Sequence, residues 1–495
     1  MASPPRESLI QSAPVQALSF TRHARAPDRG VCAVAATLAL LSGCQHYQPV
    51  PLAPEQTATE LDARSLDDPG LRTFLERHLR RSPTWPLASW DFEALTLVAF
   101  YYHPSLDLAR AQWRTARAGI ETAGGRPNPS VGVTPGYSFN PPSGTSPWFP
   151  LLSIDWPLET AGRRGFRLTR AGQLADAERW NLVSTAWQVR SNLRRHLLDH
   201  AAARQRAELL QQQLRLEQQT VTLLEARLRA GAIASHELTP PRLALAKTGL
   251  DFADAQRQTV ESRVRIADAL GLSVQAIAGT EFDDARLLAG DAATELTAAE
   301  ARQRALSSRP DILAALADYA ASESALQLEI ARQYPDLHLG TGYQFDQGEH
   351  KWSLGATAEI PVLNQNQGPI REARARREES AARFVSLQAR VIAEIDSALA
   401  AWATAAEQLT RQTEFARLTR SQAASVQALF QAGAADQLDR CTADLAAQAG
   451  DLALLEARFR VAQAAARLED ALQQPLDRWP DLESGRTAPW NSTPL

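Results

Sequence analysis

The chain carries the same pattern twice, with the two copies about 200 residues apart. His103–Leu106 corresponds to Arg309–Ile312, and Ala230–Ala232 corresponds to Ala432–Ala434. The offset between the copies falls only from 206 to 202 positions along the chain. A period this long indicates one structural unit that is built twice, because the repeats of a solenoid are far shorter.

The composition is that of a folded protein with long helices. Hydrophobic residues make up 44% of the 495 residues and charged residues 22%, which is ordinary for a globular chain. Glycine and proline cluster in a few short stretches between long tracts rich in Ala, Leu, Gln, Arg and Glu. The net charge of −4 leaves no dominant basic surface, so we expect no nucleic acid partner.

The N-terminal residues have the features of an export signal. The apolar run Val31–Leu41 follows several arginines and is too short to span a membrane, as in a signal peptide. It leads into Leu41-Ser42-Gly43-Cys44, which resembles a bacterial lipobox whose cysteine sulfur carries a diacylglycerol. The alternative is a plain cleavage site that contains a cysteine. We predict a signal peptide at residues 1–43 and a lipid-anchored segment at 44–90, acylated on Cys44.

Two stretches, at about 130–157 and 336–361, change from a helical to an alternating pattern. One set of alternate positions is apolar, and the other is small or polar. Each run has about ten residues, the length that a tilted strand needs to cross an outer membrane. Half-buried hairpins of a soluble domain alternate in the same way, but the small residues on the polar face favour membrane strands. Four strands cannot close a barrel. We therefore expect three chains to form one shared barrel of twelve strands.

A very long helical tract follows each alternating stretch. The two tracts are Gly162–Ala230 and Pro369–Ala432. At 1.5 Å per residue, roughly 65 residues reach about 100 Å, which exceeds a globular core and indicates coiled helices. Heptad spacing holds in the first tract, where Glu217 interrupts an otherwise apolar series, Leu210, Leu214, Val221, Leu224 and Leu228.

Short turns that contain glycine join the outgoing helices to the returning ones, at about 231–235 and 433–436. The glycines supply left-handed C-caps, and Ser235 and Asp436 are the predicted N-caps of the returning helices. The predicted organisation is therefore a first repeat at 91–272, an equatorial linker at 273–297, a second repeat at 298–472 and a C-terminal tail at 473–495.

Taken in this order, the features resemble those of the TolC-like outer-membrane efflux proteins, the outer-membrane factor lipoproteins. The carrying features are the duplicated unit of strands and helices, the lipobox, the tip motif Ala226–Leu238 and the closing motif Asp268–Leu272. The run Trp156–Arg164 is similar to the strand-to-helix entry of the cation-efflux, CzcC-like branch.

The resemblance implies a mainly helical fold with a small membrane β part. Three chains would form an α-barrel that continues into the 12-stranded β-barrel. The location implied is the bacterial outer membrane, with a lipid anchor and most of the chain in the periplasm. The tips would dock on a periplasmic adaptor, or membrane fusion protein, that joins an inner-membrane pump. Such a homotrimer is a passive conduit for metal ions or small toxic compounds, and it needs no cofactor.

Matching the family's motif residue by residue assigns candidate sites at the two tips. Adaptor-docking candidates lie on both tips, and the second tip lacks the arginine of the first: Arg227, Leu228, Gly231, Ser235 and Gly433. Acidic residues beside the second tip would form rings of three at a periplasmic aperture, and such rings select cations: Asp436, Asp439 and Asp444. The alternative is that Asp436 caps a helix and the other two face solvent. The difference between the two tips thus assigns docking preferentially to the first repeat and gating to the second.

The residues give no support to an enzyme. His196 and His200 have the i, i+4 spacing of a metal clamp, but a third ligand is not evident. Two other classes stay open, a periplasmic adaptor and a structural coiled-coil lipoprotein. An adaptor would have one helical hairpin where this chain has two, and a coiled-coil protein would leave the alternating strands unexplained.

Overall fold

A computed structural model describes residues 46–79, 85, 87, 89–283, 287–288 and 297–476. The predicted signal peptide, Cys44 and the tail beyond residue 476 lie outside these residues. Contacts divide the chain into residues 1–58 and 59–495, and helix α2 (Pro54–Asp62) crosses this division. The elements that follow all belong to the second unit.

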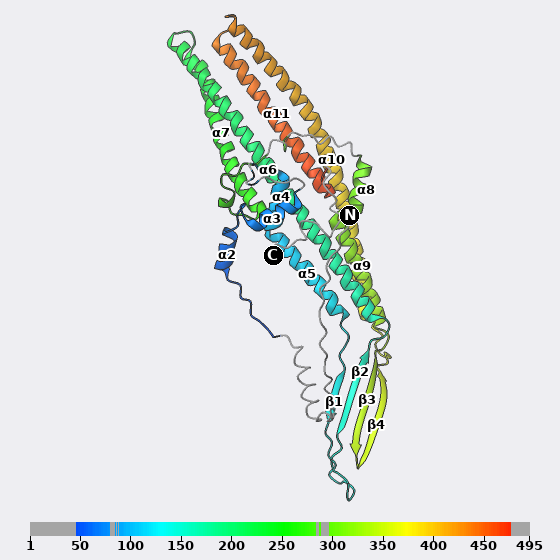
Figure 1. Cartoon of the computed structure of the whole chain (residues 1–495). Coiled ribbons are helices and arrows are strands. Elements are labelled where there is room, and N and C mark those ends of the chain that lie inside the picture. Colours follow the sequence, from blue (N-terminus) through cyan, green and yellow to red (C-terminus); the bar gives the residue numbers. More distant parts are fainter. Residues whose placement is uncertain are drawn as a thin grey trace, which may run out of the picture. The chain divides into compact units, whose positions relative to one another are not determined.

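Four long helices dominate the second unit (Figure 1). One hairpin consists of α6 (Arg163–Arg229) and α7 (Ser235–Leu270), and the other of α10 (Gln367–Gln431) and α11 (Gln437–Leu472). Helix α6 also packs against α11, so the order across the layer is α7, α6, α11, α10. None of the described helices is both long enough and apolar enough to cross a membrane.

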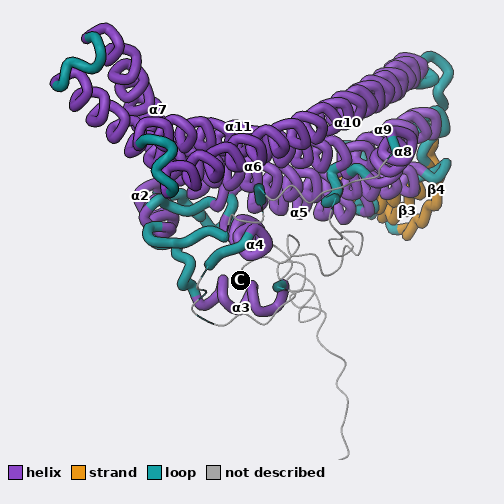
Figure 2. Tube along the Cα trace, turned by 90° about the horizontal axis from the view of Figure 1, so that it is seen from above, coloured by secondary structure: helices purple, strands orange, loops and turns teal. Residues whose placement is uncertain are grey.

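Shorter helices pack against the long ones and against one another. They are α3 (Pro69–His78), α4 (Phe92–Tyr102), α5 (Pro104–Gly124), the 3-10 turn Gln275–Ile277, α8 (Ala298–Ser308) and α9 (Pro310–Ala331). Helix α4 is buried almost throughout and packs with α3, α6 and α7 around the main hydrophobic core. Figure 2 shows α3 and α4 together on one side of the layer of long helices.

The strands form one antiparallel sheet in the order β1-β2-β3-β4. Its members are β1 (Ser130–Thr134), β2 (Leu151–Leu158), β3 (Leu337–Asp346) and β4 (Glu349–Ala358). The pairing of β2 with β3 joins the two hairpins edge to edge, for example through Ile154 opposite Thr341. Strands β1 and β4 are therefore the two outer strands, each with one neighbour.

The first hairpin is less regular than its alternating sequence predicts. Within the alternating stretch 130–157, the first strand ends at Thr134, and only the isolated bridge between Tyr137 and Trp148 continues the pairing. Pro135 follows Thr134 and has no amide hydrogen for the ladder, which explains the early end.

The register places nearly all apolar strand residues on one face of the sheet. Residues that face each other across neighbouring strands project from the same side. One side carries Val131, Val133, Leu152, Ile154, Trp156, Leu158, Leu337, Leu339, Thr341, Tyr343, Phe345, His350, Trp352, Leu354, Ala356 and Ala358. The other side is mainly small or polar, and there His338 Nδ1 lies 2.9 Å from Asp155 Oδ2.

A buried ion pair joins the two copies where α6 meets α11. The carboxylate of Glu469, with its side chain 3% exposed, lies 3.0 Å from Arg190 Nη1 and also contacts Arg194. Burial acts to raise the pKa of Glu469, but the two guanidinium groups outweigh it and hold that pKa below its ordinary value. The carboxylate is therefore ionised, and it compensates the charges of the buried Arg190 and the largely buried Arg194.

Candidate functional site

Both helical hairpins end in the same C-cap geometry. At the first tip, Gly231 has a φ of +73°, and its amide donates to the Leu228 carbonyl at 3.0 Å. The Ala232 amide donates to the Arg227 carbonyl at 2.9 Å. These two bonds define a Schellman motif. Gly433, with a φ of +74°, occupies the same place at the second tip.

The returning helices begin differently at the two tips. Asp436 is the N-cap of α11, as predicted, because its Oδ1 accepts from the amides of Leu438 and Asp439 at 2.7 and 2.9 Å. Asp439 accepts in return from the Asp436 amide at 3.0 Å, which completes a capping box. The prediction of Ser235 as the N-cap of α7 was wrong. Ser235 is the first helical residue, Ala234 is the cap, and Glu237 accepts from the Ala234 amide at 2.8 Å.

An ion pair links the tips. The guanidinium of Arg227 on α6 contacts the Asp436 carboxylate on α11, and both side chains are about half exposed. The candidate docking residue of the first repeat is therefore bonded to a candidate aperture residue of the second. Sequence reasoning missed this contact, because the two residues belong to different hairpins and no periodic signal relates them.

The other residues predicted at the tips differ in exposure. Gly231, Ser235 and Gly433 are exposed, whereas Leu228 is half-buried on the last turn of α6. Asp444 is half-buried in the second turn of α11. The second tip also contains an unpredicted contact, in which the Arg440 guanidinium lies 5.0 Å from the centre of the Phe430 ring.

Substitutions at Asp436 should separate its two contacts. The amide of Asp439 and the guanidinium of Arg227 hold the pKa of Asp436 below its ordinary value, so both contacts favour the ionised form. We expect Asp436→Ala to fray the first turn of α11 and Asp436→Asn to keep the cap while losing the ion pair. Hydrogen exchange of the Leu438 and Asp439 amides measures this. Equal exchange rates in the two variants would contradict the assignment of the cap to this side chain.

The strand-to-helix entry of the first repeat is tied to the start of the second hairpin. Thr160 Oγ1 donates to the Pro335 carbonyl at 2.5 Å, and the Thr160 amide donates to Asp336 Oδ1 at 3.2 Å. Arg163 pairs with Asp336 at 2.6 Å. The residues that resemble the cation-efflux branch thus connect the repeats where the helices meet the sheet.

The histidines considered as a metal clamp lie in different surroundings. His200 is buried, with its Nδ1 3.0 Å from Ser262 Oγ and its ring against Phe282. Burial is the main cause of the lowered pKa of His196. Across the described part of the chain, no three His, Cys, Asp or Glu residues come together as metal ligands do.

Both repeats of the chain match the same known protein family. A family model described as outer membrane efflux protein matches residues 100–272 and again residues 301–473. The chain belongs to the outer membrane efflux protein family. The two matched ranges contain the sheet, the long helical hairpins and both tips.

One relative of the chain is named for metal resistance. The chain is 24% identical over 237 residues to the cobalt-zinc-cadmium resistance protein CzcC of Cupriavidus metallidurans. That match covers 47% of this chain and spans about half, 55%, of the relative.

Solved structures share the fold of this chain at low sequence identity. A structure of CusC, described with its transmembrane channel formation, superposes with a TM-score of 0.62 at 19% identity, covering 87% of this chain and 99% of that one. The outer membrane protein VceC of Vibrio cholerae gives a TM-score of 0.63 at 18% identity, with 78% and 97% covered. The chain is therefore a mainly helical protein with a small sheet and the fold of the TolC-like channels.

Proposed function

We propose that this protein is the outer-membrane channel of a tripartite efflux system, a passive trimeric conduit that is lipid-anchored through Cys44. The observation that carries the proposal is the open sheet. It has one continuous apolar face and two outer strands, β1 and β4, that each lack a second partner. In a membrane, unpaired strand edges are not tolerated. Three copies placed β4 to β1 would give twelve antiparallel strands with no edge.

The long helices support the same assembly. Helices α7 and α10 end the layer, and each exposes large apolar side chains along its length: Leu243, Leu250, Val260 and Val264 on α7, and Val385, Phe415, Leu418 and Leu429 on α10. Leu250 is 74% exposed. A row of such residues on a soluble surface is unfavourable, and α7 of a neighbouring copy beside α10 would cover both rows. The tandem duplication then supplies six similar units around one axis.

We also propose roles for the tip residues and a first class of substrate. Arg227, Leu228, Gly231, Ser235 and Gly433 are the proposed contacts with a periplasmic adaptor, which links the channel to an inner-membrane pump. The proposed aperture consists of Asp436, Asp439 and Asp444. Divalent metal ions are the first substrates to test, because the relative CzcC is named for cobalt, zinc and cadmium, and small toxic compounds come second.

The test of the proposed function measures both the assembly of the protein into trimers and the ion conductance of those trimers. We expect the protein from outer-membrane fractions to run on gels as a trimer that dissociates on heating, and to form discrete channels in planar bilayers. Asp439→Ala should raise the ion leak of reconstituted trimers if this residue narrows the aperture. A soluble monomer without conductance would contradict the proposed function.

A further inference from the structure

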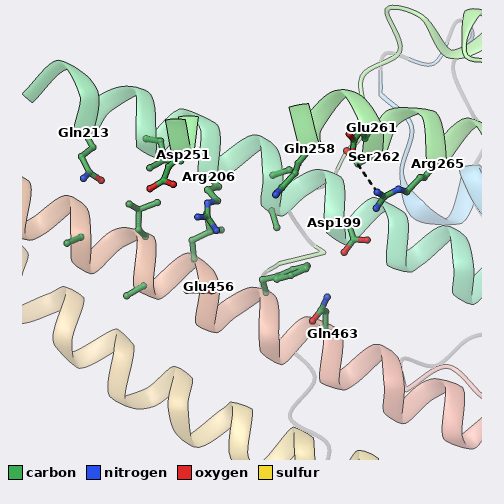
Figure 3. Close-up of a pocket in the computed structure, with 18 residues that line it drawn as sticks. Asp199, Arg206, Gln213, Asp251, Gln258, Glu261, Ser262, Arg265, Glu456 and Gln463 are labelled. Carbon is green, nitrogen blue, oxygen red and sulfur yellow. Dashed lines mark ion pairs between the residues drawn. The ribbon is translucent and has the colours of Figure 1, made fainter. Parts of the chain in front are cut away.

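Two pockets along α6 differ in the kind of side chain that lines them. Polar and charged side chains, such as those of Arg206, Asp251 and Gln258, line a pocket of about 670 Å³ among α6, α7 and α11 (Figure 3). A second pocket, of about 260 Å³, lies between the two repeats and has a mainly apolar lining. Its volume is below the roughly 300–1,000 Å³ of pockets for drug-sized ligands, so it suits a single large side chain.

Both repeats contribute to the wall of the smaller pocket. Helices α4 and α6 of the first repeat supply three aromatic side chains, those of Phe100, Trp180 and Trp187. The start of α9 in the second repeat supplies Pro310 and Leu313. Aromatic rings pack favourably against other rings in offset or edge-to-face contacts. The lining therefore favours an aromatic occupant.

The wall of the smaller pocket also has an unused hydrogen-bond acceptor. Gln473 lines the pocket, and its Oε1 is buried without a hydrogen-bond partner among the described residues. A buried acceptor without a partner costs free energy, which an N–H donor would recover. Tryptophan meets both requirements, because its indole has an apolar body and one N–H group that usually finds a partner when it is buried.

The corresponding site in the first repeat is covered by another part of the chain. At the offset between the repeats, Ser308 and Gln473 correspond to Tyr102 and Gly271. Arg64 Nη1 donates to the carbonyl of Tyr102 at 2.6 Å and to that of Gly271 at 3.1 Å. A segment that precedes the first repeat thus covers the first site, whereas the second site is a pocket.

The segment that precedes the second repeat packs elsewhere, where the structure describes it. Leu288 of this linker lies in a separate cluster with Leu198 and Leu455. The C-terminal tail, by contrast, leaves α11 at the pocket itself, because Gln474 and Pro475 form part of the wall. The tail is therefore the part of the chain that is best placed to cover the second site.

The tail contains a tryptophan close to the pocket. Trp479 follows Pro475 by four positions, and four extended residues span at most about 14 Å. We propose that the C-terminal tail folds back and places the indole of Trp479 in the smaller pocket, with its Nε1 donating to Gln473 Oε1. The tail then joins α4 and α6 of the first repeat to α8 and α9 of the second. This inference does not depend on the proposed function.

The test measures how well the tail protects a thiol on the wall of the pocket. Ser307 lines the pocket and is exposed among the described residues, so Ser307→Cys is a nearly isosteric probe. The full-length protein in a non-ionic detergent is labelled with a maleimide, and the protein that retains Ser307 gives the background from its own cysteines. We expect the added change Trp479→Ala to speed labelling about tenfold, because the cover of the pocket is lost.

Two further variants of the tail separate the proposed contact from a general effect. Trp490→Ala is the matched control, since it removes the same side chain from the same tail, and it should leave the labelling rate unchanged. Trp479→Phe should keep part of the protection, because phenylalanine retains an aromatic ring and lacks the N–H donor. Circular dichroism and thermal unfolding of each variant show whether it has folded.

The inference has clear contrary outcomes. Equal labelling rates in Trp479→Ala and Trp490→Ala would overturn it. A thiol that stays equally protected in every variant would also overturn it, because another group would then occupy the pocket. None of these outcomes affects the proposed function, which is tested by the trimers and their conductance.

Discussion

Glu469→Gln is expected to lower the free energy of unfolding by about 3 kcal/mol, because it leaves the buried Arg190 and the largely buried Arg194 without their carboxylate. Arg190 and Arg194 both contact this side chain at the α6–α11 junction. Denaturant unfolding of the detergent-solubilised protein, followed by tryptophan fluorescence, measures the loss. Trp187 lies at the same junction, where its Nε1 donates to Asp470 at 3.3 Å, so the signal reports on the affected contact.

Glu407→Gln is the control for this prediction. Its pair with Arg411 spans one turn of α10, and both side chains are largely exposed. Such pairs contribute little, so the change in stability should stay within about 0.5 kcal/mol. Similar losses in the two variants would show that burial of the Glu469 pair has no special role.

The pH dependence of the stability difference between the wild-type protein and Glu469→Gln gives a second check. The pKa of Glu469 is lowered in the folded protein from its ordinary value of 4.5. Its contribution is therefore fully present above pH 4.5 and disappears as the pH falls through the lower, folded-state pKa. The stability difference between the wild-type protein and Glu469→Gln should shrink only below pH 4.5. A difference that shrinks at neutral pH would point to another group.

Leu354→Arg is expected to prevent stable insertion of the trimer into the outer membrane. Leu354 lies on the apolar face of β4 and is 79% exposed in the single chain. An arginine that faces lipid near the middle of the membrane costs about 2–4 kcal/mol, and each trimer would contain three. The measurement is the yield of heat-sensitive trimers in outer-membrane fractions.

Gly355→Arg is the matched control, at the same depth on the opposite face of β4. A side chain added at Gly355 meets no atom within 4 Å, and in the proposed trimer it would project into the interior of the barrel. We expect this variant to form trimers in normal yield with altered conductance. If both variants assembled equally well, the apolar face of the sheet would not be the lipid-facing one.

Much of the fold could be predicted because its signals are local. The alternation around residues 336–361 predicted β3 and β4, and the turn between them contains Gln347 and Gly348, both with positive φ. Glycine after a long helical pattern placed both tips. The limits of the helices were close to those found, with α10 starting at Gln367 where Pro369 was expected.

The remaining features depend on contacts between residues that are far apart in the sequence. The Arg227–Asp436 pair and the Glu469 cluster each join one copy to the other, and nothing distinguishes these residues from the many other charges on long helices. Ser235 was predicted as a cap on residue type alone, although the cap position depends on where the backbone turns. Pro135 explains the short β1, but the alternation on both sides of it concealed the break.

The pairing of β2 with β3 has a consequence for how the molecule is made. Leu151 of β2 lies opposite Gln344 of β3, so β2 gains this neighbour only after almost two hundred further residues have been synthesised. Until then β2 presents an open edge to other chains, which promotes aggregation. Folding of this protein therefore depends on the later part of its own chain, and a product truncated after the first repeat would be a substrate for chaperones and proteases.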